Sequence, residues 1–242
     1  MRILIISDIH ANITALEAVL ADAGEVDAVW CLGDLVGYGP DPNECVEKIR
    51  QLPNLVCLIG NHDAAVAGVI SNTPFNSEAR QAVIWTQSII APTHLNFLRT
   101  LTSLEVRDSV CLAHGSPRQP VWEYVLDTRT AKQNFEHFDT PFCFVGHSHL
   151  PVVFQMHPEN ETTKLSIPVV NTARDMIPRA IFNPGSVGQP RDRDPRASYA
   201  IFDPSRHTWY YRRVSYDIQS VQDRMQLANL PERHIQRLSA GW

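Results

Sequence analysis

The sequence has no long hydrophobic run and only a small imbalance of charge. No segment approaches the ~18 apolar residues that a membrane-spanning helix needs. The apolar start, Arg2–Ser7, meets Asp8 too soon to be the core of a signal peptide. The 21 Lys and Arg residues stand against 26 Asp and Glu, a net charge of −5, without the basic blocks typical of general nucleic-acid or membrane-surface binders. We therefore expect a cytoplasmic protein with no membrane partner and no general affinity for nucleic acid.

Cysteine is also sparse, with five residues and no C-x-x-C pair. Cys31, Cys57, Cys111 and Cys143 lie inside apolar runs predicted to be strands, where a thiol behaves as a small core side chain. This usage favours a reducing compartment over a disulfide framework. With 242 residues, 44% of them hydrophobic, the chain can bury a core without cross-links. We expect one domain spanning residues 1–242.

The first third of the chain alternates strand and helix patterns. Apolar runs at Arg2–Ser7, Ala28–Leu32 and Leu55–Ile59 are typical of strands covered on both faces, and helical patterns separate them. This βαβαβ order predicts a largely parallel sheet with right-handed crossovers. Shorter strands dominate after residue 150, so we expect an α/β protein with two packed sheets. The other expected helices are 77–90, 93–101, 128–138 (with Thr128 as cap) and one or two within 221–238; the other expected strands are 104–106, 110–113, 142–145, 152–156, 165–170, 180–182, 198–202 and 209–214.

Five polar clusters interrupt the chain, each directly after an apolar strand run. In open α/β sheets, ligands bind outside the carboxyl ends of the strands, so we expect these clusters to converge. Their Asp, Asn and His side chains, without Cys, suit hard or borderline divalent metals. The first four are each common on their own, whereas two His separated by one residue, as in the last, rarely serve packing alone. The strongest signal is the joint order of all five. They are Asp8-Ile9-His10, Gly33-Asp34, Gly60-Asn61-His62-Asp63, His114-Gly115 and Gly146-His147-Ser148-His149.

This series resembles the pattern D-x-H, G-D, G-N-H-(D/E), H and G-H-x-H of the calcineurin-like metallophosphoesterases. The resemblance runs through Met1–Leu150, and Asn183–Gly188 is similar to a segment of the small bacterial and archaeal members, including phosphodiesterases and diadenosine tetraphosphatase-like proteins. It implies a four-layer αββα sandwich of two mixed β-sheets flanked by helices. The active site would lie at the carboxyl ends of the strands.

The resemblance also implies a centre of two divalent metal ions, with manganese first and iron, nickel, cobalt or zinc as alternatives. A hydroxide bridging the two ions would attack phosphorus. His62 would assist the leaving group, and Asp63 would orient the His62 ring. The implied ligands are Asp8, His10 and His149 on one ion, Asn61, His114 and His147 on the other, and Asp34 between them.

Three further residues are candidates for binding substrate. Arg118 and Arg191 suit bidentate contact with phosphate, and the alternative for each, favoured for Arg118, is a solvated loop. Tyr38 either lines the substrate mouth, stacking on a base, or packs in the interior. Asn12 and Asn183 either cap helices or turns or contact the site. Five other histidines are expected at the surface or as caps: His94, His137, His157, His207 and His234.

The resemblance also bears on the substrate class. Gly37-Tyr38 stands where the phosphoprotein phosphatases of this superfamily carry Asp-Arg, and Asp63 stands where others carry Glu. These differences favour a small-molecule phosphoester or nucleotide substrate, either a phosphodiester or a nucleotide polyphosphate. A serine/threonine phosphoprotein phosphatase and a non-catalytic binding module on the same fold are the alternatives.

Overall fold

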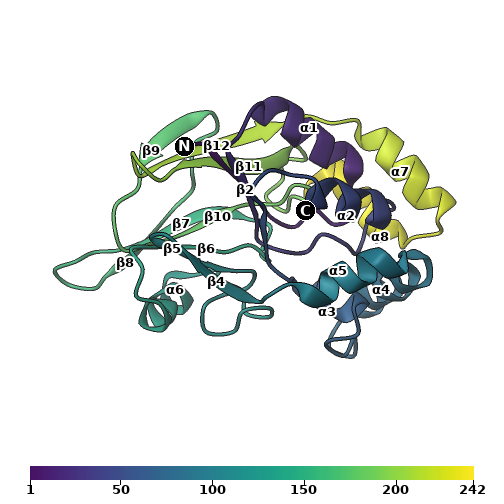
Figure 1. Cartoon of the computed structure of the whole chain (residues 1–242), viewed down its shortest axis with the longest axis horizontal. Coiled ribbons are helices and arrows are strands. Elements are labelled where there is room, and N and C mark those ends of the chain that lie inside the picture. Colours follow the sequence, from purple (N-terminus) through teal and green to yellow (C-terminus); the bar gives the residue numbers. More distant parts are fainter.

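The computed structural model describes residues 1–242 and contains two six-stranded sheets (Figure 1). The first sheet has the order β3-β2-β1-β11-β12-β9 and the second β4-β5-β6-β10-β7-β8. The strands of the first are β1 (Ile3–Ile6), β2 (Ala28–Cys31), β3 (Val56–Cys57), β9 (Thr172–Asp175), β11 (Ala197–Asp203) and β12 (Thr208–Val214). Those of the second are β4 (Leu104–Arg107), β5 (Val110–Ala113), β6 (Phe142–Phe144), β7 (Pro151–Met156), β8 (Thr163–Ser166) and β10 (Ala180–Pro184).

Both sheets mix parallel and antiparallel pairs. β1, β2 and β3 run parallel, with the predicted crossover helices α1 (Ile13–Ala23) and α2 (Pro42–Arg50) between them. β11 then joins the other edge of β1 in antiparallel register. In the second sheet, β6 lies parallel to both β5 and β10. The carboxyl ends of β1, β2, β5 and β6 therefore carry four of the five polar clusters, and the fifth follows β3.

Alternation along β1 fixes the layers. Ile3 and Ile5 face the second sheet, in a core layer that includes Phe144 and Trp209, whereas Leu4 and Ile6 face the helices. All four isoleucine and leucine side chains of the strand are fully buried, as expected for a strand covered on both faces. The expected αββα sandwich is confirmed.

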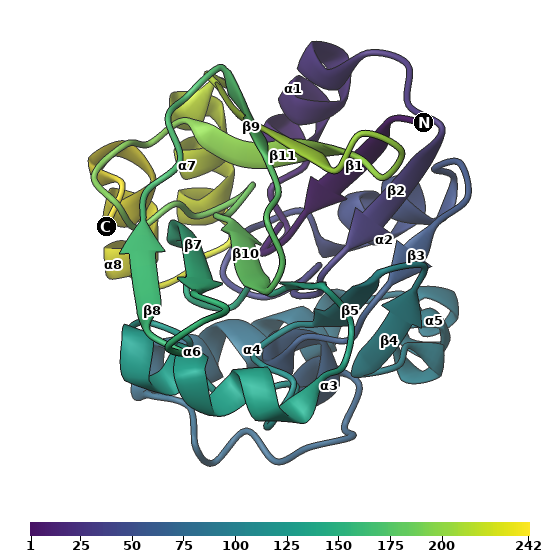
Figure 2. The same cartoon turned by 90° about the vertical axis from the view of Figure 1, so that its left-hand side faces the viewer.

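Helices cover the outer face of each sheet. α1 packs on β11 and β12, and α6 (Thr128–Asn134) packs on β7 and β8 of the other sheet. Figure 2 shows α1 and α7 on the opposite side of the sheets from α6. The remaining helices are α3 (Asn61–Val66), α4 (Ser77–Ile89), α5 (Pro92–Thr100), α7 (Ile218–Leu227) and α8 (Glu232–Ala240), with a 3₁₀ turn at Phe135–His137. None of the helices combines the length and apolarity needed to cross a bilayer.

Some local expectations were wrong. The helix expected over 128–138 ends at Asn134, and Asp127 rather than Thr128 caps it, accepting from the amide of Thr130. The strand expected over 165–170 lies at Thr163–Ser166 instead. Neither α3 nor β9 was predicted, because α3 begins inside a polar motif and β9 is a mostly exposed Thr-Ala-Arg-Asp segment without an apolar face.

Candidate metal centre

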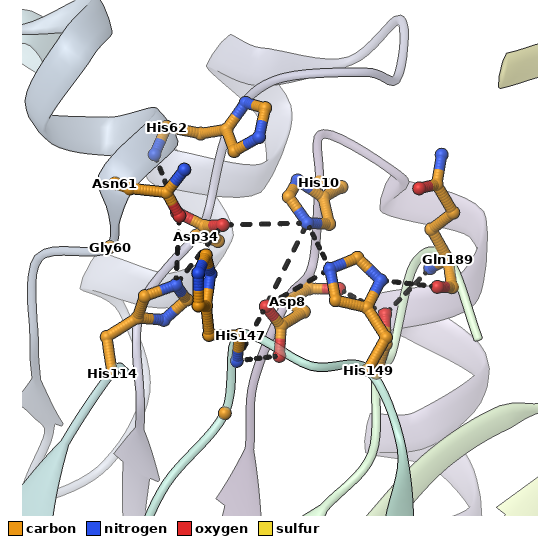
Figure 3. Close-up of polar contacts among 12 residues, drawn as sticks. Asp8, His10, Asp34, Gly60, Asn61, His62, His114, His147, His149 and Gln189 are labelled. Atoms are coloured by element: carbon orange, nitrogen blue, oxygen red, sulfur yellow. Dashed lines mark hydrogen bonds and ion pairs between the residues drawn. The ribbon is translucent and has the colours of Figure 1, made fainter. Parts of the chain in front are cut away.

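The structure brings the predicted ligands together at the carboxyl ends of the strands (Figure 3). Each is at least 96% buried, although all are polar or charged. Buried polar groups in such numbers are costly unless they pair with one another or bind an ion. Three overlapping groups have ligand atoms within 4.8 Å of one another: Asp8, His10 and His149; His10, Asp34 and His62; and Asp34, His114 and His147.

The first group joins β1 to the loop after β6. Nε2 of His10 and Nε2 of His149 lie 3.0 Å apart, and Oδ1 of Asp8 lies 3.4 Å from the latter. The ring of His10 faces the carbonyl of Val36 through Nδ1, at 3.2 Å. The ring of His149 faces the carbonyl of Gln189 in the same way, at 2.6 Å. A carbonyl accepts only from N–H, so each Nδ1 donates and each Nε2 presents a lone pair to the other.

The second group joins β2, β5, α3 and the loop after β6. His114 donates from Nδ1 to the carbonyl of Leu32, at 2.9 Å, which directs its Nε2 inward. That nitrogen lies 3.2 Å from Oδ1 of Asn61 and 3.3 Å from Oδ2 of Asp34. Nε2 of His147 is buried and has no hydrogen-bond partner. Here too, candidate ligand atoms from several elements point at one small volume.

Asp34 lies between the two groups. Its Oδ2 is 3.6 Å from Nε2 of His10 and 3.3 Å from Nε2 of His114, and its Oδ1 accepts from the amide of His62. Gly60 is required beside it, because a Cβ at that position would lie 2.0 Å from Oδ1 of Asp34. A single carboxylate thus reaches both groups, in the place where a bridging ligand is expected.

The electrostatics of the cluster suit cation binding. Burial lowers the pKa of His10 and His149 well below the ordinary value, so both rings are neutral, the form that binds a metal. Burial also acts to lower the pKa of His114, but the Asp34 carboxylate outweighs it and raises that pKa to about 9. Burial raises the pKa of Asp8 to about 7. The carboxylates around Nε2 of His114 therefore favour a positive charge there, which in the protein without metal is a proton on the ring.

The backbone is strained at the same place. Asp8, His10, Asp34, His147 and His149 all have φ between 49° and 63°, in the left-handed region that non-glycine residues rarely occupy. Each such residue costs of order 1 kcal/mol or more, and such conformations concentrate at functional sites. The turns after the strands thus direct five candidate ligands inward, and the strained backbone lowers the stability of the folded protein.

This donor set fits two divalent ions of the kind that bind oxygen and imidazole nitrogen. The facing lone pairs of His10 and His149, 3.0 Å apart, repel each other unless a cation lies between them. Nε2 of His147 is buried and likewise stays unsatisfied unless it binds a cation. Two carboxylates with neutral imidazoles and one amide oxygen favour manganese, iron, cobalt, nickel or zinc over calcium or a thiolate-bound metal.

His62 lines the cavity beside the cluster, in the first turn of α3. Its ring lies edge-on to His10 and also contacts Tyr38, with centroid distances of 5.0 and 4.3 Å. Asp63 does not orient this ring as expected. Its carboxylate accepts from the amides of Val36 and Gly60, at 3.0 Å each, and Nδ1 of His62 has no partner. Asp63 therefore ties α3 to the loop after β2, and aromatic packing holds His62.

The three candidate substrate-binding residues have different fates. Arg118 pairs with Glu123 and Gln133 and does not line the cavity, so its predicted contact with substrate is not supported. Arg191 does line it, and its Nη2 donates to Gln189. Tyr38 is 8% exposed and packs between the rings of His10, His62 and His234, which makes it mainly an interior residue with one edge on the cavity.

Sequence reasoning missed several residues around the cavity, which has a volume of about 280 Å³. Phe75, Trp122 and Tyr124 line it, but they belong to loops without a periodic pattern. His234 was expected at the surface or as a cap and is instead 1% exposed, against Tyr38. The helical spacing of apolar residues in α8 gave a hint, since Ile235 and Leu238 are buried on that same face. Asn12 caps α1, and Asn183 donates to Gly146 and Ser148.

Comparison with known proteins gives the site its context. Residues 1–207 match the model of the calcineurin-like phosphoesterase superfamily domain. The crystal structure of a metallophosphoesterase from Sphaerobacter thermophilus is 49% identical in sequence, with a TM-score of 0.91 over 100% of this chain and 99% of that one. An uncharacterized protein of Methanocaldococcus jannaschii is 39% identical over 99% of this chain and 98% of its own length.

A more distant relative carries a named activity. The symmetrical bis(5'-nucleosyl)-tetraphosphatase of Pectobacterium carotovorum is 30% identical over 129 residues, which cover 51% of this chain and 46% of that enzyme. The similarity to this enzyme thus spans about half of either chain. The ordered polar clusters, the sandwich fold and the family match agree. This chain belongs to the calcineurin-like phosphoesterase superfamily.

Proposed function

We propose that the protein is a phosphohydrolase that cleaves phosphodiester or nucleotide polyphosphate bonds with the help of two divalent cations. The observation that carries this proposal is the pair of ligand groups that meet at Asp34, with imidazole lone pairs facing one another. Two cations held there would lower the pKa of a water molecule and screen the charge of the phosphoryl oxygens. The ions would be held by the seven residues expected from the sequence, with manganese as the first candidate.

The chain's own residues have distinct tasks in this proposal. Asp34 fixes the spacing between the two ligand groups, and the carbonyls of Val36, Leu32 and Gln189 fix the imidazole rings. His62 donates a hydrogen bond to the leaving-group oxygen. Burial lowers its pKa to about 4, and an arriving phosphate would favour its protonated form. Arg191 has guanidinium N–H groups beyond the one given to Gln189, and these can bind a phosphoryl oxygen.

A small phosphoester is favoured over a phosphoprotein. The cavity is small for a peptide, and Tyr38 cannot replace the phosphate-binding arginine of the protein phosphatases because its ring is packed among three histidines. The ligand set together with His62 argues against a purely binding role. Residues 1–242 would act as one metallophosphoesterase domain, and its cytoplasmic location is likewise a prediction.

A substrate panel tests the proposal. A monoester, a diester, a dinucleotide polyphosphate and a phosphopeptide are each assayed with Mn²⁺, Fe²⁺, Ni²⁺, Co²⁺ or Zn²⁺ added in turn to metal-depleted protein. We expect hydrolysis of the diester or the dinucleotide polyphosphate, with Mn²⁺ among the activating ions. Phosphate release from the phosphopeptide alone would overturn the substrate class, and no hydrolysis with any metal would overturn the activity.

The role of His62 has its own test. His62→Ala is expected to lower kcat by about 10²–10⁴-fold, the usual contribution of a positioned proton donor. The matched control is His137→Ala, which removes an exposed histidine from the far side of the second sheet. Undiminished activity of the His62 variant would remove this residue from the mechanism.

A further inference from the structure

One side of the cavity is an aromatic wall, made of Phe75, Trp122 and Tyr124. Phe75 precedes α4, and its ring contacts both His62 and Trp122 edge-on, with centroid distances of 4.8 and 5.2 Å. Tyr124 stacks on His147, with a centroid distance of 3.8 Å and an interplanar angle of 16°. The wall therefore begins at His62 and at the predicted metal ligand His147 and extends outward from them.

Phe75 is buried, but the other two rings of the wall are more exposed than core side chains. Tyr124 is 46% exposed and Trp122 is half-buried, although each carries a large apolar ring. Exposed aromatic rings that converge on a concave polar site are typical of ligand recognition. The rings of Trp122 and Tyr124 leave surface available to a further planar group.

A network on the other side of the chain holds this loop in place. Glu123, between Trp122 and Tyr124, accepts from Ser116 at 2.7 Å and from Nδ2 of Asn134 at 2.8 Å, and it pairs with Arg118. These contacts draw the carboxylate away from the cavity while the two neighbouring rings line it. The loop is thus fixed before any ligand arrives, which lowers the entropic cost of binding.

The cavity also includes the groups that would hold a phosphate. Arg191, Asn61 and Asp34 line it together with the aromatic wall, within a volume of about 280 Å³. This space is near the lower limit of small-molecule sites and admits one ring system joined to a phosphoryl group. A ligand that places a phosphoryl group at the polar cluster therefore meets the aromatic rings with its neighbouring substituent.

We propose that the aromatic wall binds a nucleobase, so that Trp122 and Tyr124 select a nucleotidyl group beside the scissile phosphate. This inference rests on the proposed phosphohydrolase function and specifies its substrate as a nucleotide. Stacking on an aromatic side chain suits any base, since every base has a π-face. Trp122 and Tyr124 are then specificity residues, and Arg118 and Glu123 are positioning residues that act through them.

Binding of a product separates this inference from catalysis. AMP and ribose 5-phosphate share the sugar and phosphate and differ only in the base, so their calorimetric Kd values on the Mn²⁺-loaded protein isolate the contribution of the wall. We expect AMP to bind about 10-fold more tightly, the effect of one stacked base. Trp122→Ala and Tyr124→Ala should each reduce this preference to within about 3-fold. Trp122→Ala, which removes a ring that is not stacked on a predicted metal ligand, should leave the Kd of ribose 5-phosphate unchanged.

Two further variants serve as controls. Trp122→Phe keeps a ring and should retain most of the preference. Leu126→Ala changes an exposed side chain of the same loop that lines a separate apolar groove, and it should have no effect. Equal affinity of the wild type for the two ligands, or equal weakening of both by Trp122→Ala, would overturn the inference. A preference for AMP in a protein that hydrolyses no phosphoester would support the wall while overturning the proposed activity.

Discussion

The polar cluster and the aromatic wall border the same cavity but are built in different ways. The cluster lies on turns directly after buried strands, and backbone carbonyls of neighbouring strands and loops hold its imidazoles. The wall lies on two irregular loops, and one of them depends on the side-chain contacts of Glu123. Rigid strand ends favour reproducible chemistry, whereas loops can change their side chains without altering the scaffold. We therefore expect changes in the cluster to affect every substrate and changes in the wall to affect only some.

The largest expected effect comes from the carboxylate shared by both ligand groups. Asp34→Asn keeps the shape of the side chain but removes the charge that faces His10 and His114. Because charge stabilisation by a bound metal is worth several kcal/mol, we expect kcat/KM to fall at least about 100-fold for diester and nucleotide substrates alike. Steady-state kinetics and metal content measure the effect.

A matched control keeps this prediction specific. Asp22→Asn removes a carboxylate that pairs with Tyr199 and Arg212 on the outer side of the first sheet, and it should leave kcat/KM within about 2-fold. Wild-type activity in the Asp34 variant, or a loss for one substrate class only, would contradict the assignment of Asp34 to the shared chemistry.

A smaller effect on activity is expected from Gly37, which makes room for His62. Gly37 has a φ of +87°, and a Cβ there would lie 2.4 Å from Nδ1 of His62. Gly37→Ala should displace this ring and lower kcat about 10- to 100-fold, as misplacement of a catalytic group by ~1 Å does. The fall should be the same for diester and nucleotide substrates, which kinetics on both will measure.

A substitution at a second glycine serves as the control for backbone strain. Gly24 has a φ of +66° and a ψ of −149°, a backbone conformation that is essentially restricted to glycine, and a Cβ there would meet no atom within 4 Å. Gly24→Ala therefore strains the backbone without touching the cluster. Backbone strain should cost each variant about 1–3 kcal/mol of stability, and only Gly37→Ala should lose activity beyond what lower stability explains. An equal loss of activity in both would mean that the effect comes from stability rather than from His62.

The same contrast explains what the sequence alone could predict. Strand, turn and ligand are contiguous in motifs such as Asp8-Ile9-His10, so the sheet and the polar cluster follow from local patterns. The position of Arg118 could not be predicted, because its partner Glu123 lies in a loop whose sequence shows no helix or strand pattern. The prediction that Asp63 orients the His62 ring was wrong for a related reason. Adjacent residues at the start of a helix point in different directions, so proximity to His62 in sequence did not imply contact.

His234 illustrates the remaining gap. It lies in α8, beyond the residues matched by the family model, and it contacts Tyr38 because α8 packs against the loops after β1 and β2. No motif connects residue 234 to residue 38. Such contacts depend on tertiary packing between distant segments, which hydrophobic periodicity indicates only as a buried face.

The smallest expected effect isolates the wall from the cluster. Burial acts to raise the pKa of Glu123, but hydrogen bonds from Arg118, Asn134 and Ser116 outweigh it and lower that pKa to about 2, against an ordinary 4.5. The carboxylate therefore stabilises the fold above pH 4.5, and this contribution is lost as the pH falls towards 2. Glu123→Gln should cost about 1–2 kcal/mol at pH 7, because the pair borders solvent and is partly screened, and the difference from wild type should shrink between pH 4.5 and 2. Urea unfolding at several pH values measures this, with the exposed Glu159→Gln as control.

Glu123→Gln should also weaken the preference for AMP over ribose 5-phosphate while leaving hydrolysis of a substrate without a base unchanged. A loss of activity on that substrate as large as in Asp34→Asn would mean that wall and cluster form one inseparable unit.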